Sequence, residues 1–155
     1  MESPHIAPKV ILFLDFDGVV QTPALTHWQE MEHCQGLRDL LQAIPELEVV
    51  VTSTHRDGRD LAGVRALLPD DIALRVVGAT PVTPLGRADG GRQDEIEAWL
   101  QELGGPATWA AVDDEKHLYD PGCAHLVLTN KFLGWDEQTT EAVVRVLDQG
   151  RLQGL

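Results

Sequence analysis

Hydrophobic and polar positions along the chain form two alternating patterns, short continuous apolar runs and longer stretches with helical spacing. Each apolar run ends in turn or polar residues, which is typical of strands that are buried on both faces of a parallel sheet. The runs predict strands at residues 10–14, 47–53, 72–77, 108–112 and 125–129.

Between these runs, apolar residues recur every three or four positions and predict amphipathic helices. The expected helices cover residues 37–44, 61–68, 95–103 and a last stretch around 142–147. Proline or glycine follows the first three of them, as expected where helices end. Residues 21–27 and 79–91 read as loops, the latter because it holds two prolines and three glycines.

Strands that alternate with helices imply right-handed βαβ units. We therefore expect an α/β fold, a three-layer sandwich around a Rossmann-like, mostly parallel five-stranded sheet. The length of 155 residues suits one domain over residues 1–155, with its core at about 9–148.

Two carboxylates directly follow the first predicted strand. Because side chains alternate along extended backbone, we expect Asp15 and Asp17 to point to the same side. Neighbouring carboxylates repel each other, and a divalent cation would relieve that repulsion. Gly18 permits a sharp turn and a close approach of the backbone to a ligand.

Other reactive side chains follow the second and fourth strands. Residues Thr52-Ser53-Thr54-His55-Arg56 follow the second strand, and Asp113 and Asp114 follow the fourth. Arg92 stands at a helix start, where a cation opposes the helix dipole, which favours a functional role over a structural one. Since ligands bind beyond the carboxyl ends of parallel strands, we expect these groups to converge. Hydroxyl and N–H donors suit phosphate oxygens, and clustered carboxylates suit Mg²⁺.

The charge and the cysteines limit the possible partners and location. A formal net charge of −13 argues against non-specific binding to nucleic acid, which relies on basic surface. Cys34 and Cys123 lie outside any C-x-x-C pattern and are expected to be reduced thiols, although their pairing stays open. With no long apolar span and no signal-peptide pattern in residues 1–9, we expect a cytoplasmic protein without a membrane partner.

The order of these motifs resembles the haloacid dehalogenase (HAD) superfamily of phosphohydrolases, and more closely the small HAD domain of Swiss Army Knife RNA repair proteins. The shared order is D-x-D-G, a strand-end Thr or Ser, a basic residue that opens a helix, and Asp-Asp after a strand. The resemblance covers roughly residues 10–134. The stretches that carry it are FLDFDGV at 13–19, VVTSTHR at 50–56, VGATP at 77–81, RQDEI at 92–96 and WAAVDD at 109–114.

The resemblance implies a capless Mg²⁺-dependent phosphomonoesterase that acts through an aspartyl-phosphate intermediate. Asp15 would be the nucleophile, and Asp17 would protonate the leaving group and then deprotonate the hydrolytic water. Arg92 would stand where the family has a Lys or Arg that steadies the charge of the phosphoaspartate. Arg87 is a second, weaker candidate for that role because it lies within the loop.

The resemblance also implies how phosphate and metal would be bound. Mg²⁺ would contact the Asp15 carboxylate, the Asp17 backbone carbonyl and an acid of the Asp113-Asp114 pair, and which acid binds directly stays open. Thr52 or Ser53 would hold a phosphoryl oxygen. Residues that would contact the substrate are Gly18, Thr54 and Arg56, of which Arg56 can equally be a solvated surface residue. His55 departs from the pattern, because relatives often have Trp before this Arg.

Several other functions compete with hydrolysis of a phosphomonoester. The same intermediate could pass its phosphoryl group to another hydroxyl in a phosphotransferase, and a binding module could hold phosphate without catalysis. A dehalogenase would not need the acid at Asp17. A signalling receiver domain carries its acid pair at the first strand, whereas here the pair follows the fourth.

The spacing of the motifs leaves no room for a cap domain, since independent domains begin at about 50 residues. The gaps at residues 19–36 and 57–91 are shorter than that. We expect an open site that a phosphorylated RNA end could reach, received by Arg56, Arg59 and Arg92. The alternatives are a small metabolite or nucleotide as substrate, and a second subunit that supplies a lid; the oligomeric state stays open.

Overall fold

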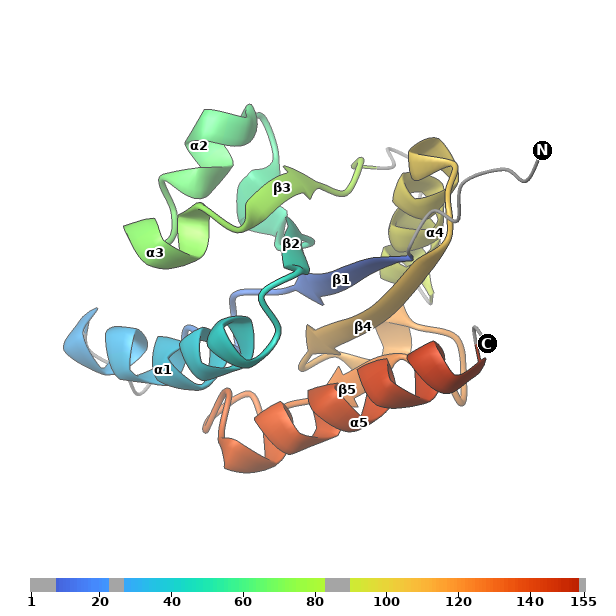
Figure 1. Cartoon of the computed structure of the whole chain (residues 1–155). Helices are drawn as coiled ribbons and strands as arrows, with labels where there is room; N and C mark the ends of the chain where they lie inside the picture. The colour runs from blue at the N-terminus through green and yellow to red at the C-terminus, as the bar shows by residue number, and fades with distance from the viewer. Residues whose placement is uncertain (1–7, 23–26, 83–89, 154–155) are drawn as a thin grey trace.

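The computed structural model describes residues 8–22, 27–82 and 90–153; within residues 27–34 and 152–153 it describes the backbone alone. Five parallel strands form one sheet in the order β3-β2-β1-β4-β5 (Figure 1). The expected α/β fold is confirmed, and within the described residues every strand of the sheet is parallel. The strands are β1 (Lys9–Leu14), β2 (Leu47–Val51), β3 (Val76–Ala79), β4 (Ala107–Asp113) and β5 (Leu126–Leu128).

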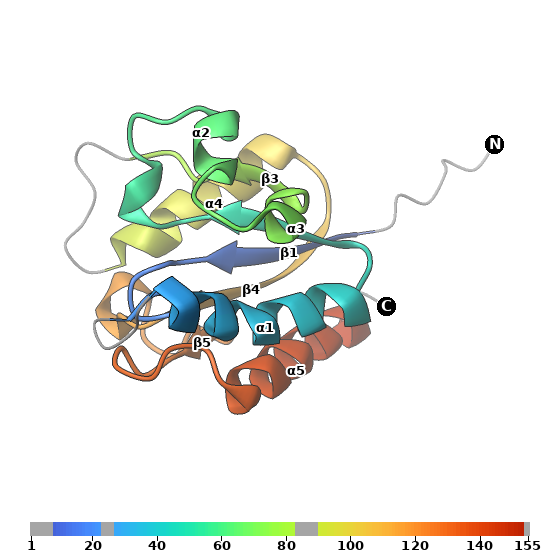
Figure 2. The same ribbon diagram turned by 90° about the vertical axis from the view of Figure 1, so that its left-hand side faces the viewer.

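Helices cover both faces of the sheet and make three layers. Helices α1 and α5 lie side by side on one face, and α4 lies on the other, as two views of the chain show (Figures 1 and 2). The helices are α1 (His27–Ala43), α2 (Leu61–Arg65), α3 (Asp70–Ala73), α4 (Gly91–Leu103) and α5 (Glu137–Gln153), with 3-10 turns η1 (Thr54–Arg56) and η2 (Lys116–Leu118).

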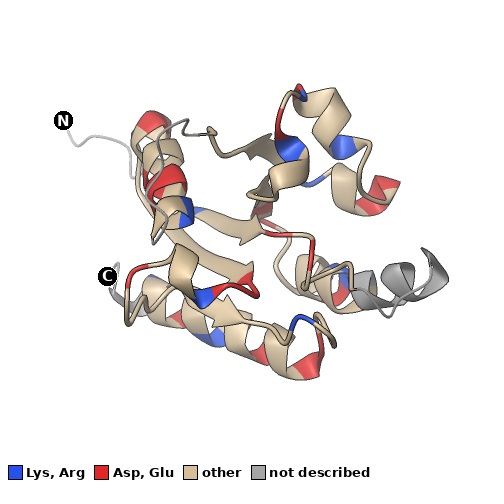
Figure 3. Cartoon of the chain, turned by 180° about the vertical axis from the view of Figure 1, so that it is seen from behind, with Lys and Arg blue, Asp and Glu red and all other residues tan. Residues whose placement is uncertain are grey.

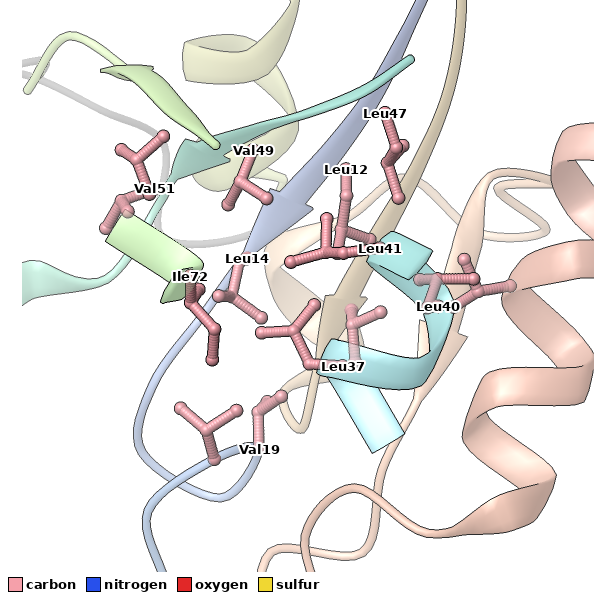
Figure 4. Close-up of a cluster of buried hydrophobic side chains, with 14 of the residues drawn as sticks. Leu12, Leu14, Val19, Leu37, Leu40, Leu41, Leu47, Val49, Val51 and Ile72 are labelled. Atoms are coloured by element: carbon pink, nitrogen blue, oxygen red, sulfur yellow. The ribbon is translucent and has the colours of Figure 1, made fainter. Parts of the chain in front are cut away.

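Strand β1 sends alternate side chains into two separate hydrophobic clusters. Leu12 and Leu14 pack with residues of α1, α3 and α5 on one face (Figure 4). Phe13 points to the other face, where its ring packs nearly perpendicular to the rings of Trp99 and Trp109. Both clusters are buried, so the continuous apolar run of β1 reflects a strand covered on both sides.

The prediction of a strand at residues 72–77 is wrong. Ile72 belongs to the short helix α3, and β3 begins only at Val76. Asp70 and Asp71 lie in the first turn of α3, where carboxylates favour a helix. Arg75 then donates to carbonyls of the α1–β2 segment and fixes the turn between α3 and β3.

Helix bounds also differ from the apolar pattern. Helix α1 begins at His27, ten residues before the apolar spacing indicates, and α4 begins at Gly91 rather than at residue 95. Gly90, in a left-handed conformation, precedes α4 and marks this earlier start. The first turn of α4 carries polar residues that periodicity cannot assign to a buried face, which is why the sequence missed it.

The described residues hold no cap domain. Between β2 and α4 they contain only η1, α2, α3 and β3. Of the loop expected at 79–91, residues 83–89 are not among the residues that the structure describes. No helix of the described chain has the length and apolar character needed to span a membrane.

The path of the chain changes direction between β1 and β4. Helix α1 and the segment α2–α3 lead outward through β2 to β3, and α4 returns on the opposite face to β4. In open parallel sheets, ligands bind at the carboxyl end of such a switch point. Backbone hydrogen bonds continue past the strand ends here, with Asp15 N–H donating to Val112 and Thr52 N–H donating to Leu14.

Candidate active site

Three carboxylates gather where β1 and β4 end. Leu14 pairs with Val112 in register, so Asp15 and Asp113 leave neighbouring strands at the same level. Oxygens of Asp15, Asp113 and Asp114 all lie within 4.8 Å of one another. Asp15 is 5% exposed and Asp113 is fully buried. The structure thus brings together three of the four acids that the sequence singled out.

Arg92 reaches this cluster from the start of α4. Its Nη1 lies 3.1 Å from Asp15 Oδ1 and 2.8 Å from Asp113 Oδ2, and the side chain is buried. Burial by itself would lower the pKa of Arg92, but the carboxylates of Asp113 and Asp15 outweigh it and raise that pKa. The guanidinium therefore stays charged and joins the two acids. Arg87, the other candidate, lies outside the described residues.

Burial and mutual repulsion change the pKa values of two acids in the cluster. Burial, and then the charge of Asp113, raise the pKa of Asp15 to about 8, although Arg92 opposes the shift. The same two causes raise the pKa of Asp114. A hard divalent cation prefers oxygen ligands and would relieve this repulsion, so the donor set fits such an ion.

Asp113 has protein partners on both of its oxygens. Oδ2 accepts from Arg92 and from the Tyr119 hydroxyl at 3.1 Å, and Oδ1 accepts from the N–H of Glu115. Tyr119 is buried, and burial together with Asp113 raises its pKa well above the usual value. Sequence reasoning missed Tyr119, and nothing around it in the sequence marks it as part of this site.

The structure does not bring the Asp17 side chain into the cluster. That side chain is 69% exposed, and its Oδ2 lies 3.1 Å from Nε2 of His55. Alternation of side chains holds only for extended backbone, and β1 ends at Leu14, before either acid. The N–H groups of Val19, Val20 and Gln21 all bond back to Phe16, which makes a tight turn here.

Gly18 allows a close approach, as expected, but to a protein side chain. Its φ is 77°, and an added Cβ would collide with the Asp114 carboxylate. The Gly18 carbonyl accepts a hydrogen bond from Thr129 Oγ1 at 2.7 Å, which ties this turn to the end of β5. The glycine lets the turn after β1 pack directly against the acid that follows β4.

The three hydroxyl residues after β2 have different surroundings. Thr52 Oγ1 is buried and has no hydrogen-bond partner among the described residues, whereas Ser53 Oγ caps η1 by accepting from the N–H of His55. Thr54 is exposed in η1. A buried hydroxyl without a partner is costly unless something else satisfies it. This distinguishes Thr52 as the hydroxyl that a ligand could satisfy.

Arg56 matches neither of its expected roles, because it is buried and its donors are occupied. Its guanidinium donates to the carbonyls of Thr52, Ser53, Thr80 and Pro81. It also pairs with Glu95 at 2.6 Å. Arg56 therefore braces the ends of β2 and β3 against α4. Arg59 is exposed and donates to the His55 carbonyl.

The fold and the acid cluster at its switch point define the core of the HAD superfamily, as the motif order indicated. The family model described as the HAD domain in Swiss Army Knife RNA repair proteins matches residues 11–140, and the chain belongs to this family. No curated protein and no solved structure matches the chain significantly.

Proposed function

We propose that the protein is a Mg²⁺-dependent phosphomonoesterase that works through an aspartyl-phosphate. The observation that carries this proposal is the set of three carboxylates within 4.8 Å, joined by Arg92 at the switch point of the sheet. A buried nucleophile beside a fixed cation is what attack on a phosphate dianion requires, because the attacking and attacked groups are both negative.

The proposed reaction has two steps. An Asp15 oxygen bonds to phosphorus while the bond from phosphorus to the leaving oxygen breaks, and Asp17 gives its proton to that oxygen. A water then loses a proton to Asp17 and attacks the same phosphorus, which breaks the bond to Asp15 and releases inorganic phosphate. The exposure of Asp17 supports this role, since both the leaving group and the water must come through the open side of the site.

Other residues would hold the phosphoryl group and the metal. Thr52 would donate its unsatisfied hydroxyl to a phosphoryl oxygen, and Arg92 would offset the charge on Asp15. Asp114 is the stronger candidate for direct metal contact, because both oxygens of Asp113 already have protein partners. Bound there with Asp15 and the Asp17 carbonyl, Mg²⁺ would neutralise and orient the substrate phosphate.

Phosphorylated RNA ends are the first substrates to test, since the family is described from RNA repair proteins. An open site without a cap in the described residues is compatible with a large substrate. Arg56 and Arg92 do not form the receiving surface expected from the sequence, because both are buried and paired. A basic surface for such a substrate has to come from other residues.

Turnover of an aryl phosphate tests the proposed activity. We expect release of inorganic phosphate in Mg²⁺ and none in EDTA, and transfer to an added alcohol would indicate a phosphotransferase instead. Activity that persists in EDTA would contradict the mechanism. A higher kcat/KM for a phosphorylated oligonucleotide than for the matching mononucleotide would support RNA ends, and a preference for a small sugar phosphate would reject them.

A further inference from the structure

An open pocket of about 650 Å³ adjoins the acid cluster at Asp114. The loop after β4 forms one side of it, and Lys131, which follows β5, forms another. Tyr119 lies in its wall and also donates to Asp113, so the pocket is in direct contact with the candidate active site. Its charged and titratable lining also includes Glu115, Lys116 and His117.

Two basic residues in this pocket, Lys116 and Lys131, have no hydrogen-bond or ion-pair acceptor among the described residues. The structure describes all of the twelve lysines and arginines except Arg87. Among those described, Lys116, Lys131 and Arg145 are the three with no carboxylate or carbonyl partner. The other eight have one: Lys9, Arg38, Arg56, Arg59, Arg65, Arg75, Arg92 and Arg151. Two of the three unpaired cations therefore line one pocket beside Asp114.

Most other basic positions of the described chain differ from this pair because they have partners. Figure 3 shows several of them around η1 and α2, and there Arg56, Arg59 and Arg65 donate to carbonyl oxygens. Lys131 stands 5.2 Å from the centre of the Phe132 ring, a cation–π contact that satisfies its ammonium group without a carboxylate or carbonyl acceptor. The chain has a net charge of −13, so two ammonium groups without a carboxylate or carbonyl partner in one pocket stand out. Such a pair indicates a binding site for an anion.

The charges at the mouth of the site favour an anion when the metal is bound. Arg92 and a divalent cation together balance the carboxylates of Asp15, Asp113 and Asp114. Glu115 is then the remaining carboxylate of the pocket wall whose charge is not balanced by Arg92 and the metal. The same wall carries two lysines and His117. A phosphate group, with several acceptor oxygens, matches such a set of nitrogen donors.

We propose that this pocket binds a second phosphate of the substrate, carried by the leaving group, through Lys116 and Lys131. The inference rests on the proposed function, because the pocket meets the acid cluster at Asp114, and the phosphate to be removed would bind at that cluster. The preferred substrates would then carry a phosphate or a phosphodiester besides the phosphate that is hydrolysed. That chemistry is shared by nucleoside bisphosphates and by the ends of a polynucleotide.

Kinetics of matched substrates tests the pocket. The substrates are a nucleoside 5′-monophosphate, the 3′,5′-bisphosphate of the same nucleoside, and a 5′-phosphorylated dinucleotide. We expect the wild type to prefer the last two through a lower KM. Lys116→Gln and Lys131→Gln should each reduce that preference roughly 2- to 5-fold, the scale of an exposed ion pair. Arg145→Gln removes the same charge outside the pocket lining and should leave the preference unchanged.

Equilibrium binding separates failure of the pocket from failure of the catalytic proposal. In an Asp15→Asn background, calorimetry should show tighter binding of the bisphosphate than of the monophosphate, and Lys116→Gln with Lys131→Gln should abolish the difference. Lysine-dependent binding without wild-type turnover would retain the pocket and reject the phosphatase. Turnover without any preference, or an equal loss in Arg145→Gln, would overturn the pocket. A preference for the dinucleotide over the bisphosphate would identify a phosphodiester as the second group.

Discussion

Asp15 and Asp17 are separated by one residue, yet their environments are opposite. Asp15 is 5% exposed, contacts Arg92 and lies among other carboxylates. The Asp17 side chain is 69% exposed and has the imidazole of His55 beside it. Phe16, between them, is buried, so the tight turn after β1 places one acid inside and the other at the surface. A nucleophile needs a fixed, dry position, whereas an acid–base group must exchange protons with water.

The inner region, which we define as the buried cluster around Asp15, also holds like charges that destabilise the fold. Three acids lie together in a buried cluster. Burial, and then the charge of Asp113, raise the pKa of Asp15, although Arg92 opposes the shift. Asp17 lies outside this cluster, with 69% of its side chain exposed to solvent. The two acids should therefore respond differently to substitution, pH and metal.

Asp15→Asn should have the largest effect and reduce turnover to background, because the amide is a poor nucleophile and a weaker cation ligand. It should not unfold the protein, since the raised pKa of Asp15 means that the fold already disfavours the charged carboxylate there. Phosphate release and circular dichroism on the same sample check both parts. Substantial turnover by a folded Asp15→Asn protein would contradict the assignment of the nucleophile.

Asp17→Asn should lower kcat by about 10²–10⁴-fold, the usual scale of general acid–base catalysis. Its exposed position predicts an unchanged melting temperature, in contrast to changes within the cluster. Rapid-quench detection of a phosphorylated protein would show whether the second step is slowed. An equal loss for a substrate with a very good leaving group and one with a poor leaving group would argue against proton donation by Asp17.

Much of the inner region around Asp15 could be predicted from the sequence. Little could be predicted of the outer region, which consists of Asp17 and its neighbour His55. Apolar runs fix β1 and β4 as buried strands, and parallel strands end at one edge, so the meeting of Asp15 with Asp113 follows from pattern alone. The orientation of Asp17 depends on a turn whose hydrogen bonds no local pattern encodes. The contact of Tyr119 was missed because it depends on how the loop after β4 folds back on Asp113, which no apolar pattern encodes. The structural role of Arg56 was missed because its partner Glu95 lies 39 residues away and an arginine is by default expected at the surface.

Arg56→Met should destabilise the fold by about 3–5 kcal/mol, because it leaves Glu95 and several buried carbonyls without their donor. Arg56 holds the segment that carries Thr52 and His55, so activity should fall with the folded fraction. Urea unfolding measures the loss, and Arg59→Met, which removes an exposed arginine, is the matched control. A stable Arg56→Met protein with weakened oligonucleotide binding would restore the substrate-clamp interpretation.

Mg²⁺ should stabilise the folded protein by about 2–3 kcal/mol at a hundredfold excess over its dissociation constant. The stability of the metal-free protein should fall as pH rises from about 4 to about 8, since folded Asp15 keeps its proton in this range and the unfolded chain does not. The ion competes with that proton, so the Mg²⁺-dependent rise in Tm should be larger at pH 8 than at pH 5.

Thermal denaturation in EDTA and in Mg²⁺ at several pH values measures both effects. Asp113→Ala combined with Asp114→Ala should erase the response to Mg²⁺, and Asp148→Asn, an exposed acid on α5, should preserve it. A Tm that saturating Mg²⁺ does not change would show that the cluster is not a preformed cation site.

The smallest effect should come from substitution of His55. This substitution tests whether Asp17 needs a neighbour that fixes its orientation. His55 stacks on Phe16 and meets Asp17 through Nε2, so it offers both a packing surface and a hydrogen bond. Trp, which relatives often have at this position, also carries one ring N–H donor, whereas Phe has none. His55→Phe should lower kcat by roughly 2- to 10-fold, the range of one partly exposed hydrogen bond. His55→Trp should stay near the wild type. Equal rates for the two variants would mean that the ring only covers Phe16, and that Asp17 transfers its proton without being oriented by a neighbour.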